Sequence, residues 1–105
     1  MQKPWLDSYI PGTPAEIDLS DGATLVSIFE DAARRFADGP AFSCMGHAIS
    51  YGELDRMSAE FAGWLTGELG LKPGTRVAIM LPNVLQYPVA LFGILRAGMT
   101  VVNVN

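Results

Sequence analysis

The sequence predicts an α/β fold in which a helix, a hairpin and a second helix precede a parallel strand–helix–strand unit. Two observations carry this prediction. Apolar residues recur at helical spacing over residues 25–36 and again over 54–69. Further on, β-branched runs at 77–81 and 99–104 enclose an apolar helical segment, which is the arrangement of a βαβ unit. Such a unit should have a right-handed crossover and need helices on both faces of its sheet.

The composition describes one small apolar domain. Of the 105 residues, 50% are hydrophobic and 17% are charged, with a formal net charge of −4. This balance indicates a globular rather than a disordered chain. All 11 acidic residues lie within residues 1–68, whereas Lys72, Arg76 and Arg96 are the only charged residues after that. Without a basic cluster, no nucleic-acid partner is expected.

The single cysteine, the N-terminus and the long uncharged segment each exclude a class of protein or site. Cys44 is the only cysteine, so neither an intrachain disulfide nor a cysteine-based zinc site can form, which fits a reducing cytosol. His47 is expected in a turn, without a role in metal binding or in activating Cys44. The N-terminus lacks the apolar core of a signal peptide. The 19 uncharged residues between Arg76 and Arg96 have the length of a membrane span, but prolines interrupt them.

Residues 1–23 have no helical or strand periodicity and are rich in proline and glycine. We expect an irregular N-terminal arm that docks its aromatic side chains, Trp5 and Tyr9, onto the body of the chain. The alternative is that the arm makes a dimer contact.

The next two elements are an amphipathic helix and a hairpin. Thr24 or Asp21 should cap the helix that runs from Leu25 to Phe36, and its charged face should be solvated. Residues 41–44 and 48–50 then read as strands joined through Met45-Gly46-His47, a tight turn that needs Gly46 at positive φ.

A second amphipathic helix should begin at Ser50, because Ser50-Tyr51-Gly52-Glu53 matches the capping box. Gly70 is suited to end it in a left-handed conformation, with Leu71 as the apolar contact of a Schellman motif. Lys72 to Thr75 should form a type II turn with Gly74 at its third position. The expected buried stripe of this helix consists of Leu54, Met57, Phe61, Ala62, Leu65 and Leu69.

The last helix, which ends at Arg96-Ala97-Gly98, has almost no polar face and should be buried. Asn83 and Gln86 resemble a capping pair at its start, and Pro88 fits best in an irregular first turn. Arg96 should oppose the negative end of the helix dipole rather than bind substrate.

In open α/β sheets ligands bind beyond the carboxyl ends of the strands, which here are Pro82-Asn83 and Asn103-Val104-Asn105. Neither segment is a glycine-rich phosphate loop, and the chain has no G-x-G-x-x-G and no Walker A motif. Capping or turn formation is therefore the expected role of Asn83 and Asn105.

Residues 79–105, IMLPNVLQYPVALFGILRAGMTVVNVN, resemble the corresponding segment of bacterial long-chain fatty acid–CoA ligases, members of the adenylate-forming (acyl-CoA synthetase) superfamily. Weaker resemblance extends upstream through Trp5-Leu6, the helix after Leu25, Pro40-Ala41-Phe42 and Gly70-Leu71-Lys72, and so covers essentially the whole chain. It implies that residues 24–105 are the N-terminal part of the AMP-binding large domain, truncated at its C-terminus. It also implies an enzyme that converts fatty acid, ATP and CoA to acyl-CoA through an acyl-adenylate, with ATP, magnesium and CoA bound by the full-length protein.

The resemblance assigns no catalytic, cofactor-binding or metal-ligating residue to this chain. The family's phosphate loop, ribose-binding aspartate and adenylation lysine all lie downstream of the similar segment, so the chain alone should be inactive. The implied partner is the remainder of the enzyme. A homodimer and a cytoplasmic location, with peripheral association at the inner face of the membrane, are further implications. The alternative is a stand-alone scaffolding or dimerisation module.

Overall fold

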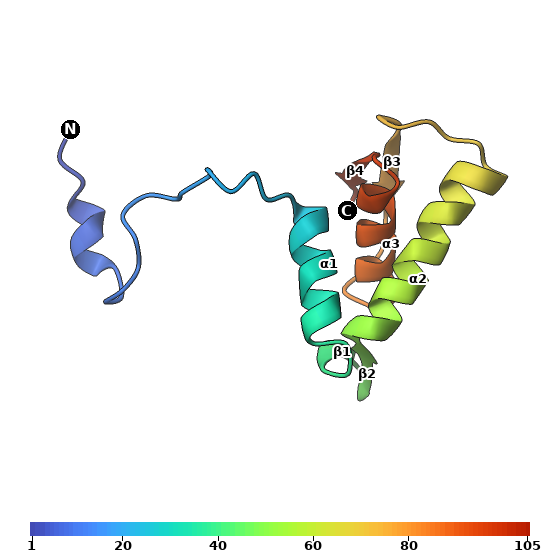
Figure 1. The fold of residues 1–105 in the computed structure, drawn as a ribbon, viewed down its shortest axis with the longest axis horizontal. Helices are drawn as coiled ribbons and strands as arrows, with labels where there is room; N and C mark the ends of the chain where they lie inside the picture. Colours follow the sequence, from blue (N-terminus) through green and yellow to red (C-terminus); the bar gives the residue numbers. More distant parts are fainter.

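A computed structural model describes all residues 1–105. Three α-helices lie side by side, with one small sheet at each end of the helical layer, and the N-terminal arm extends away from this body (Figure 1). The hairpin strands pair antiparallel, and the last two strands pair parallel. In chain order the elements are η1 (Pro4–Ser8), α1 (Leu25–Arg35), β1 (Pro40–Cys44), β2 (His47–Ser50), α2 (Tyr51–Gly63), η2 (Trp64–Glu68), β3 (Arg76–Ile79), α3 (Gln86–Arg96) and β4 (Thr100–Asn103).

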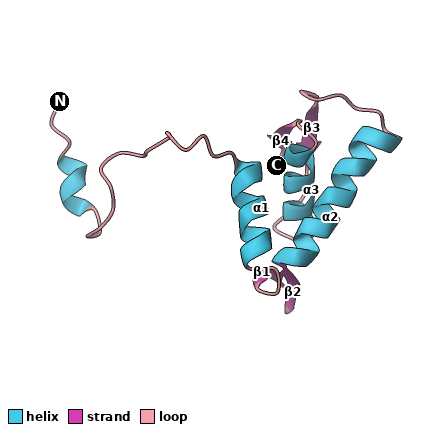
Figure 2. Ribbon diagram, viewed as in Figure 1, coloured by secondary structure: helices cyan, strands magenta, loops and turns pink.

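The predicted docking of the N-terminal arm onto the body is wrong. The arm is irregular apart from one turn of 3-10 helix at η1, and it lies apart from the helices (Figure 2). Trp5 and Tyr9 remain 49% and 41% exposed. Its hydrogen bonds and its ion pair, Lys3 with Glu16 at 2.9 Å, join arm residues to one another. Because the apolar residues of the arm follow no period, they form no continuous face that could pack on a helix.

Thr24, and not Asp21, caps α1. The Ser27 amide donates to Thr24 Oγ1 at 3.0 Å, and the Thr24 amide donates to Ser27 Oγ at 2.8 Å, so the two side chains form a reciprocal capping box. Phe29 and Ala33 of the predicted stripe are buried, whereas Leu25 and Ile28 stay more than half exposed. The apolar face of α1 is thus only partly covered.

The hairpin has the predicted turn with one difference. Met45 and Gly46, at φ 51° and 79°, are its two central residues, which is the type I′ pattern of a two-residue loop. His47 is therefore the first residue of β2, paired with Cys44, and not a turn residue as predicted.

The capping box predicted at the start of α2 is confirmed. The Glu53 amide donates to Ser50 Oγ at 3.1 Å, and the Ser50 amide donates to Glu53 Oε2 at 2.9 Å. At its far end the helix widens into the π-helical turn η2. Gly70, at φ 60°, then reverses the chain as predicted. The Leu71 amide donates to the Leu65 carbonyl oxygen, one residue further back than in the Schellman motif, because the helix ends in the wider π-helical turn.

The predicted buried stripe of α2 is only partly correct. Leu54 and Leu65 are buried, but Met57 is 36% and Leu69 is 49% exposed. Ser58, which was not predicted, is completely buried. The α2 face toward α3 is thus narrower than the periodicity suggests.

The parallel pairing of the last two strands is confirmed, with Arg76 opposite Thr100 and Ile79 opposite Asn103. Both strands are shorter than predicted, because regular pairing ends before Met80 and before Val104. The predicted turn that leads into β3 is present, with Gly74 at φ 86°. The right-handed sense of the crossover stays a prediction.

The start of α3 differs from the prediction. Its N-cap is Leu85, and no side chain caps it, so the Asn83–Gln86 capping pair is wrong. Backbone turns from Pro82 to Val84 and from Val84 to Tyr87 replace it. Pro88 lies in the first turn, where a missing amide removes no helical hydrogen bond.

The interior consists of two small apolar clusters on either side of α3. Phe29, Ala33, Ile49 and Leu54 form the first, between α1, β2 and α2. The second, between η2, β3, α3 and the start of β4, contains Leu65, Ile79, Ile94 and Met99. None of the helices has the length and apolarity needed to cross a membrane.

Candidate functional site

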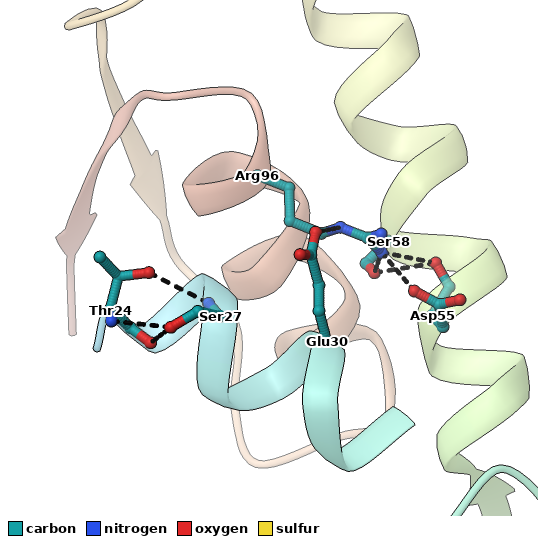
Figure 3. Close-up of polar contacts among 6 residues, drawn as sticks. All are labelled: Thr24, Ser27, Glu30, Asp55, Ser58 and Arg96. Atoms are coloured by element: carbon teal, nitrogen blue, oxygen red, sulfur yellow. Dashed lines mark hydrogen bonds and ion pairs between the residues drawn. The ribbon is translucent and has the colours of Figure 1, made fainter. Parts of the chain in front are cut away.

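The side chain of Arg96, on α3, makes polar contacts with α1 and α2 and so joins all three helices (Figure 3). Its Nη1 donates to the Asp55 carbonyl oxygen at 2.8 Å and to Ser58 Oγ at 2.9 Å. The same nitrogen lies 2.8 Å from Asp55 Oδ1, and Nε lies 3.6 Å from Glu30 Oε1. The guanidinium also lies 5.6 Å from the centre of the Phe29 ring.

These contacts redefine the role of Arg96. We predicted that it would oppose the dipole of α3, and it does lie in the last turn of that helix. Its side chain, however, is only 17% exposed and directs its donors at α1 and α2. Ser58 is held as well, because its hydroxyl donates to the Asp55 carbonyl at 3.1 Å. Arg96 is thus a structural tie between helices, with Nη1 and Nε engaged within the chain.

Gly93 allows α2 and α3 to approach closely beside this tie. A Cβ at Gly93 would lie 2.6 Å from Phe61 Cδ1 and 3.1 Å from the Ser58 carbonyl oxygen. The first distance is shorter than real Cβ atoms show, and the second involves backbone that cannot turn aside. A glycine is therefore required at this crossing.

The carboxyl edge of the parallel sheet, where ligands bind in open α/β sheets, is largely apolar. A shallow hollow there is lined by Met80, Leu81, Pro82, Val104 and Asn105. The Tyr87 hydroxyl donates to Asn103 Oδ1 and so joins the first turn of α3 to the end of β4. This hydrogen bond holds α3 against the carboxyl edge of the sheet, but neither of its two side chains offers a charge to a ligand.

The basic residues after residue 68 do not gather at the carboxyl edge of the sheet, where the phosphates of a nucleotide would be expected. Lys72 and Arg76 lie at the amino end of β3, because Arg76 begins that strand. Arg96 ends α3, just before β4 begins, so it lies toward the same end of the unit. No basic residue after residue 68 therefore follows the carboxyl end of a strand, and no step of nucleotide chemistry can be assigned to them.

Cys44 and His47 are the other residues considered for chemistry. They pair across the hairpin, and Cys44 Sγ donates to the Asn83 carbonyl oxygen at 3.5 Å. No group of three or more His, Cys, Asp or Glu side chains lies close enough together to hold a metal ion. Asn83 contributes only its backbone here, as a turn residue.

An apolar groove of about 210 Å³ lies where α1, β1, α2 and α3 meet. Phe29 and Phe92, stacked with their ring centres 4.2 Å apart, are among its lining residues. Leu25, Ile28 and Phe42 contribute further apolar side chains. The groove has no charged residue, so it is a surface for apolar contact rather than for acid–base chemistry.

Three carboxyl groups have lowered pKa values, and local contacts within the fold explain each one. Hydrogen bonds from the Ser50 backbone amide and side chain hold the pKa of Glu53 below its ordinary value. Arg34 and Arg35 lower the pKa of Asp31 on the solvent face of α1, and Ser20 lowers that of Asp18 in the arm. None of the three lines the groove or the sheet edge.

Comparison with known families decides the identity of the chain. The model of the family described as AMP-binding enzyme matches residues 29–105, which is most of the chain. The chain belongs to the AMP-binding enzyme family. The resemblance found in residues 79–105, and its weaker extension upstream into α1, are thereby confirmed.

Curated relatives match this chain over its whole length. A long-chain-fatty-acid–CoA ligase of Salmonella typhimurium is 56% identical over 105 residues, and one of Haemophilus influenzae is 44% identical. Both alignments cover 100% of this chain but only 19% of the relative. The chain thus spans about a fifth of the length of the curated relatives it matches.

Solved structures show the same fold within larger chains. The N-terminal subdomain of Klebsiella oxytoca NpsA superimposes with a TM-score of 0.73 at 26% identity, over 77% of this chain and 21% of that one. VinN in complex with 3-methylaspartate gives a TM-score of 0.74 at 26% identity, over 79% and 23%. The predicted α/β fold of an adenylate-forming N-terminal region is confirmed.

Proposed function

We propose that this chain is the N-terminal part of a long-chain fatty acid–CoA ligase. The whole enzyme would join a fatty acid to ATP as an acyl-adenylate with release of pyrophosphate, and then transfer the acyl group to CoA. The observation that carries this proposal is the identity of 44–56% to such ligases across every residue of the chain. ATP, magnesium, CoA and the fatty acid would be bound by the rest of the protein.

Within that enzyme, residues 1–105 would act as structure. The Arg96 tie joins the three helices, and the close crossing at Gly93 holds α2 and α3 together. The exposed apolar groove and sheet edge would be covered by the remainder of the protein, which is the partner this proposal names. The lone cysteine agrees with a cytoplasmic location. A homodimer and peripheral attachment to the membrane remain part of the proposal without a residue of this chain assigned to them.

A chimera tests the proposal. Residues 1–105 replace the matching segment of the Salmonella typhimurium ligase, and formation of palmitoyl-CoA is measured with ATP, magnesium and CoA. We expect activity close to that of the parent ligase, because the replaced segment supplies no catalytic group. A chimera that folds, as judged by circular dichroism, yet forms no palmitoyl-CoA would contradict the proposal. The parent ligase lacking the segment is the negative control.

A further inference from the structure

The groove between α1, β1, α2 and α3 is an almost entirely apolar surface. Seven of its eight lining side chains are purely hydrocarbon, and the eighth, Tyr51, adds one hydroxyl. Leu25, Ile28 and Phe42 line it while remaining 65%, 57% and 45% exposed. Leaving this much aliphatic and aromatic surface in water is unfavourable, at about 25 cal/mol per Å². Covering the groove would therefore stabilise the protein.

Chemistry restricts what the occupant can be. A loop or a strand edge would bring free amide and carbonyl groups into a groove that offers them almost no hydrogen-bond partners. A helix has satisfied its own backbone groups and presents only side chains. A fatty acyl chain fits less well, because about 210 Å³ is below the range of small-molecule pockets and no polar side chain other than Tyr51 could orient a carboxylate.

The length of the related proteins indicates where this helix comes from. The chain spans 19% of the ligases it matches, and in solved structures its fold occupies only 21–23% of the larger chain. About four fifths of such a polypeptide therefore lies outside residues 1–105. The arm of this chain is a poor candidate, since it forms only a five-residue 3-10 helix and extends away from the helical body (Figure 1).

We propose that the groove formed by α1, β1, α2 and α3 is the docking site for the apolar face of a helix from the remainder of the ligase polypeptide. This inference rests on the proposed function for the source of the helix. Ile28, at the exposed edge of the groove, contacts the incoming helix, while Arg34 on the charged face of α1 stays in water. Docking would complete the first apolar cluster, which the chain alone leaves open on this side.

Cysteine accessibility tests this docking site. In a Cys44→Ser background, Ile28→Cys places a thiol at the groove, and Arg34→Cys places one on the opposite face of the same helix. Both are made in the isolated chain and in the chimera, and maleimide labelling of each peptide is followed by mass spectrometry. Circular dichroism checks that each variant of the isolated chain retains its helices.

We expect the thiols of both variants to react in the isolated chain. In the chimera the Ile28→Cys thiol should react at least about tenfold more slowly, because it becomes reachable only by local opening, whereas the Arg34→Cys thiol should be unchanged. Equal reactivity of the groove thiol in both proteins would overturn the inference, and so would equal protection of the two thiols. These outcomes do not depend on ligase activity, so an inactive chimera with a protected groove thiol refutes only the proposed function.

A photoreactive amino acid incorporated at position 28 during synthesis of the chimera identifies the occupant without labelling a buried thiol. We expect cross-links in the chimera to a segment outside residues 1–105 whose apolar residues recur at helical spacing. Cross-links to residues 1–23 of a second copy would overturn the proposal in favour of an exchanged arm. Protection of the groove thiol in the isolated chain by palmitate would overturn it in favour of an acyl-binding groove.

Discussion

At the residue scale, one arginine contacts all the other helices of the layer. Arg96 donates hydrogen bonds to two residues of α2, the Asp55 carbonyl oxygen and Ser58 Oγ. A hydrogen bond to a charged group contributes about 1.5–3 kcal/mol, and more of that is lost where the partner stays buried. Ser58, which is fully buried, is such a partner.

We therefore expect Arg96→Met, which keeps most of the apolar stem, to lower the free energy of unfolding by about 1–3 kcal/mol. Arg56→Met is the control, because Arg56 makes one exposed pair with Glu60 on α2, a kind of pair that contributes less than about 1 kcal/mol. Denaturant titration measures both variants. Equal losses in the two variants would show that Arg96 is no more than a surface charge.

The close crossing at Gly93 gives a second prediction. Gly93→Ala should destabilise the chain by about 1–3 kcal/mol, because the added methyl group forces α2 and α3 apart. Gly63→Ala is the matched control, since Gly63 has helical φ and ψ and a Cβ there meets nothing within 4 Å. That control should be neutral or more stable by up to about 1 kcal/mol. Thermal unfolding that ranks Gly93→Ala at or above Gly63→Ala would refute the crossing.

At the element scale, the two capping boxes set where α1 and α2 begin. We expect Ser50→Ala to lower the free energy of unfolding by about 1 kcal/mol, because the Glu53 amide then loses its acceptor. Ser43→Ala, at an exposed position of β1, serves as the control and should change stability by less than about 0.5 kcal/mol. An unchanged denaturant midpoint in Ser50→Ala would contradict the capping role.

The same box predicts a dependence on pH. Because the folded pKa of Glu53 lies below its unfolded value, its charge stabilises the fold above the ordinary glutamate pKa of about 4.3. That contribution is lost as the pH falls through the lower folded value. Glu53→Gln keeps the acceptor but not the charge. The stability difference between the native chain and Glu53→Gln should therefore be present at neutral pH and vanish in acid, and a constant difference would contradict it.

Local signals allowed most elements to be predicted. The Ser50 box, the Gly46 and Gly70 reversals and the Pro73-Gly74 turn each depend on a few neighbouring residues, so the sequence contains the whole signal. Asn83 was misassigned because its spacing to Gln86 imitates a cap, while backbone turns around Pro82 start α3 instead. At the start of α3, the backbone turns therefore take the place of the side-chain cap that the sequence pattern suggests.

At the scale of the whole molecule, prediction was weaker because it needs distances between elements. Ser58 and Arg96 are 38 residues apart, and nothing in their local sequence marks them as partners. A polar residue within the α2 stripe opposite a glycine of α3 was the one available signal. The predicted docking of the arm was wrong for a related reason. Isolated apolar residues that follow no helical or strand period do not indicate which surface they pack against.

The arrangement of charge over the whole molecule leads to the last prediction: the chain alone neither activates a fatty acid nor binds ATP specifically. Adenylation requires donors and cations placed where negative charge develops on the transferred phosphate. Here the sheet edge that could hold a ligand is apolar, Lys72 and Arg76 lie at the other end of β3, and Arg96 is bound to Asp55 and Glu30. Pyrophosphate release with ATP, magnesium, palmitate and CoA should equal a control without protein, and calorimetry should detect no saturable binding of ATP. The active chimera is the positive control for both measurements. Turnover by residues 1–105 alone, or saturable micromolar binding of ATP, would mean that this apolar edge forms a nucleotide site in solution.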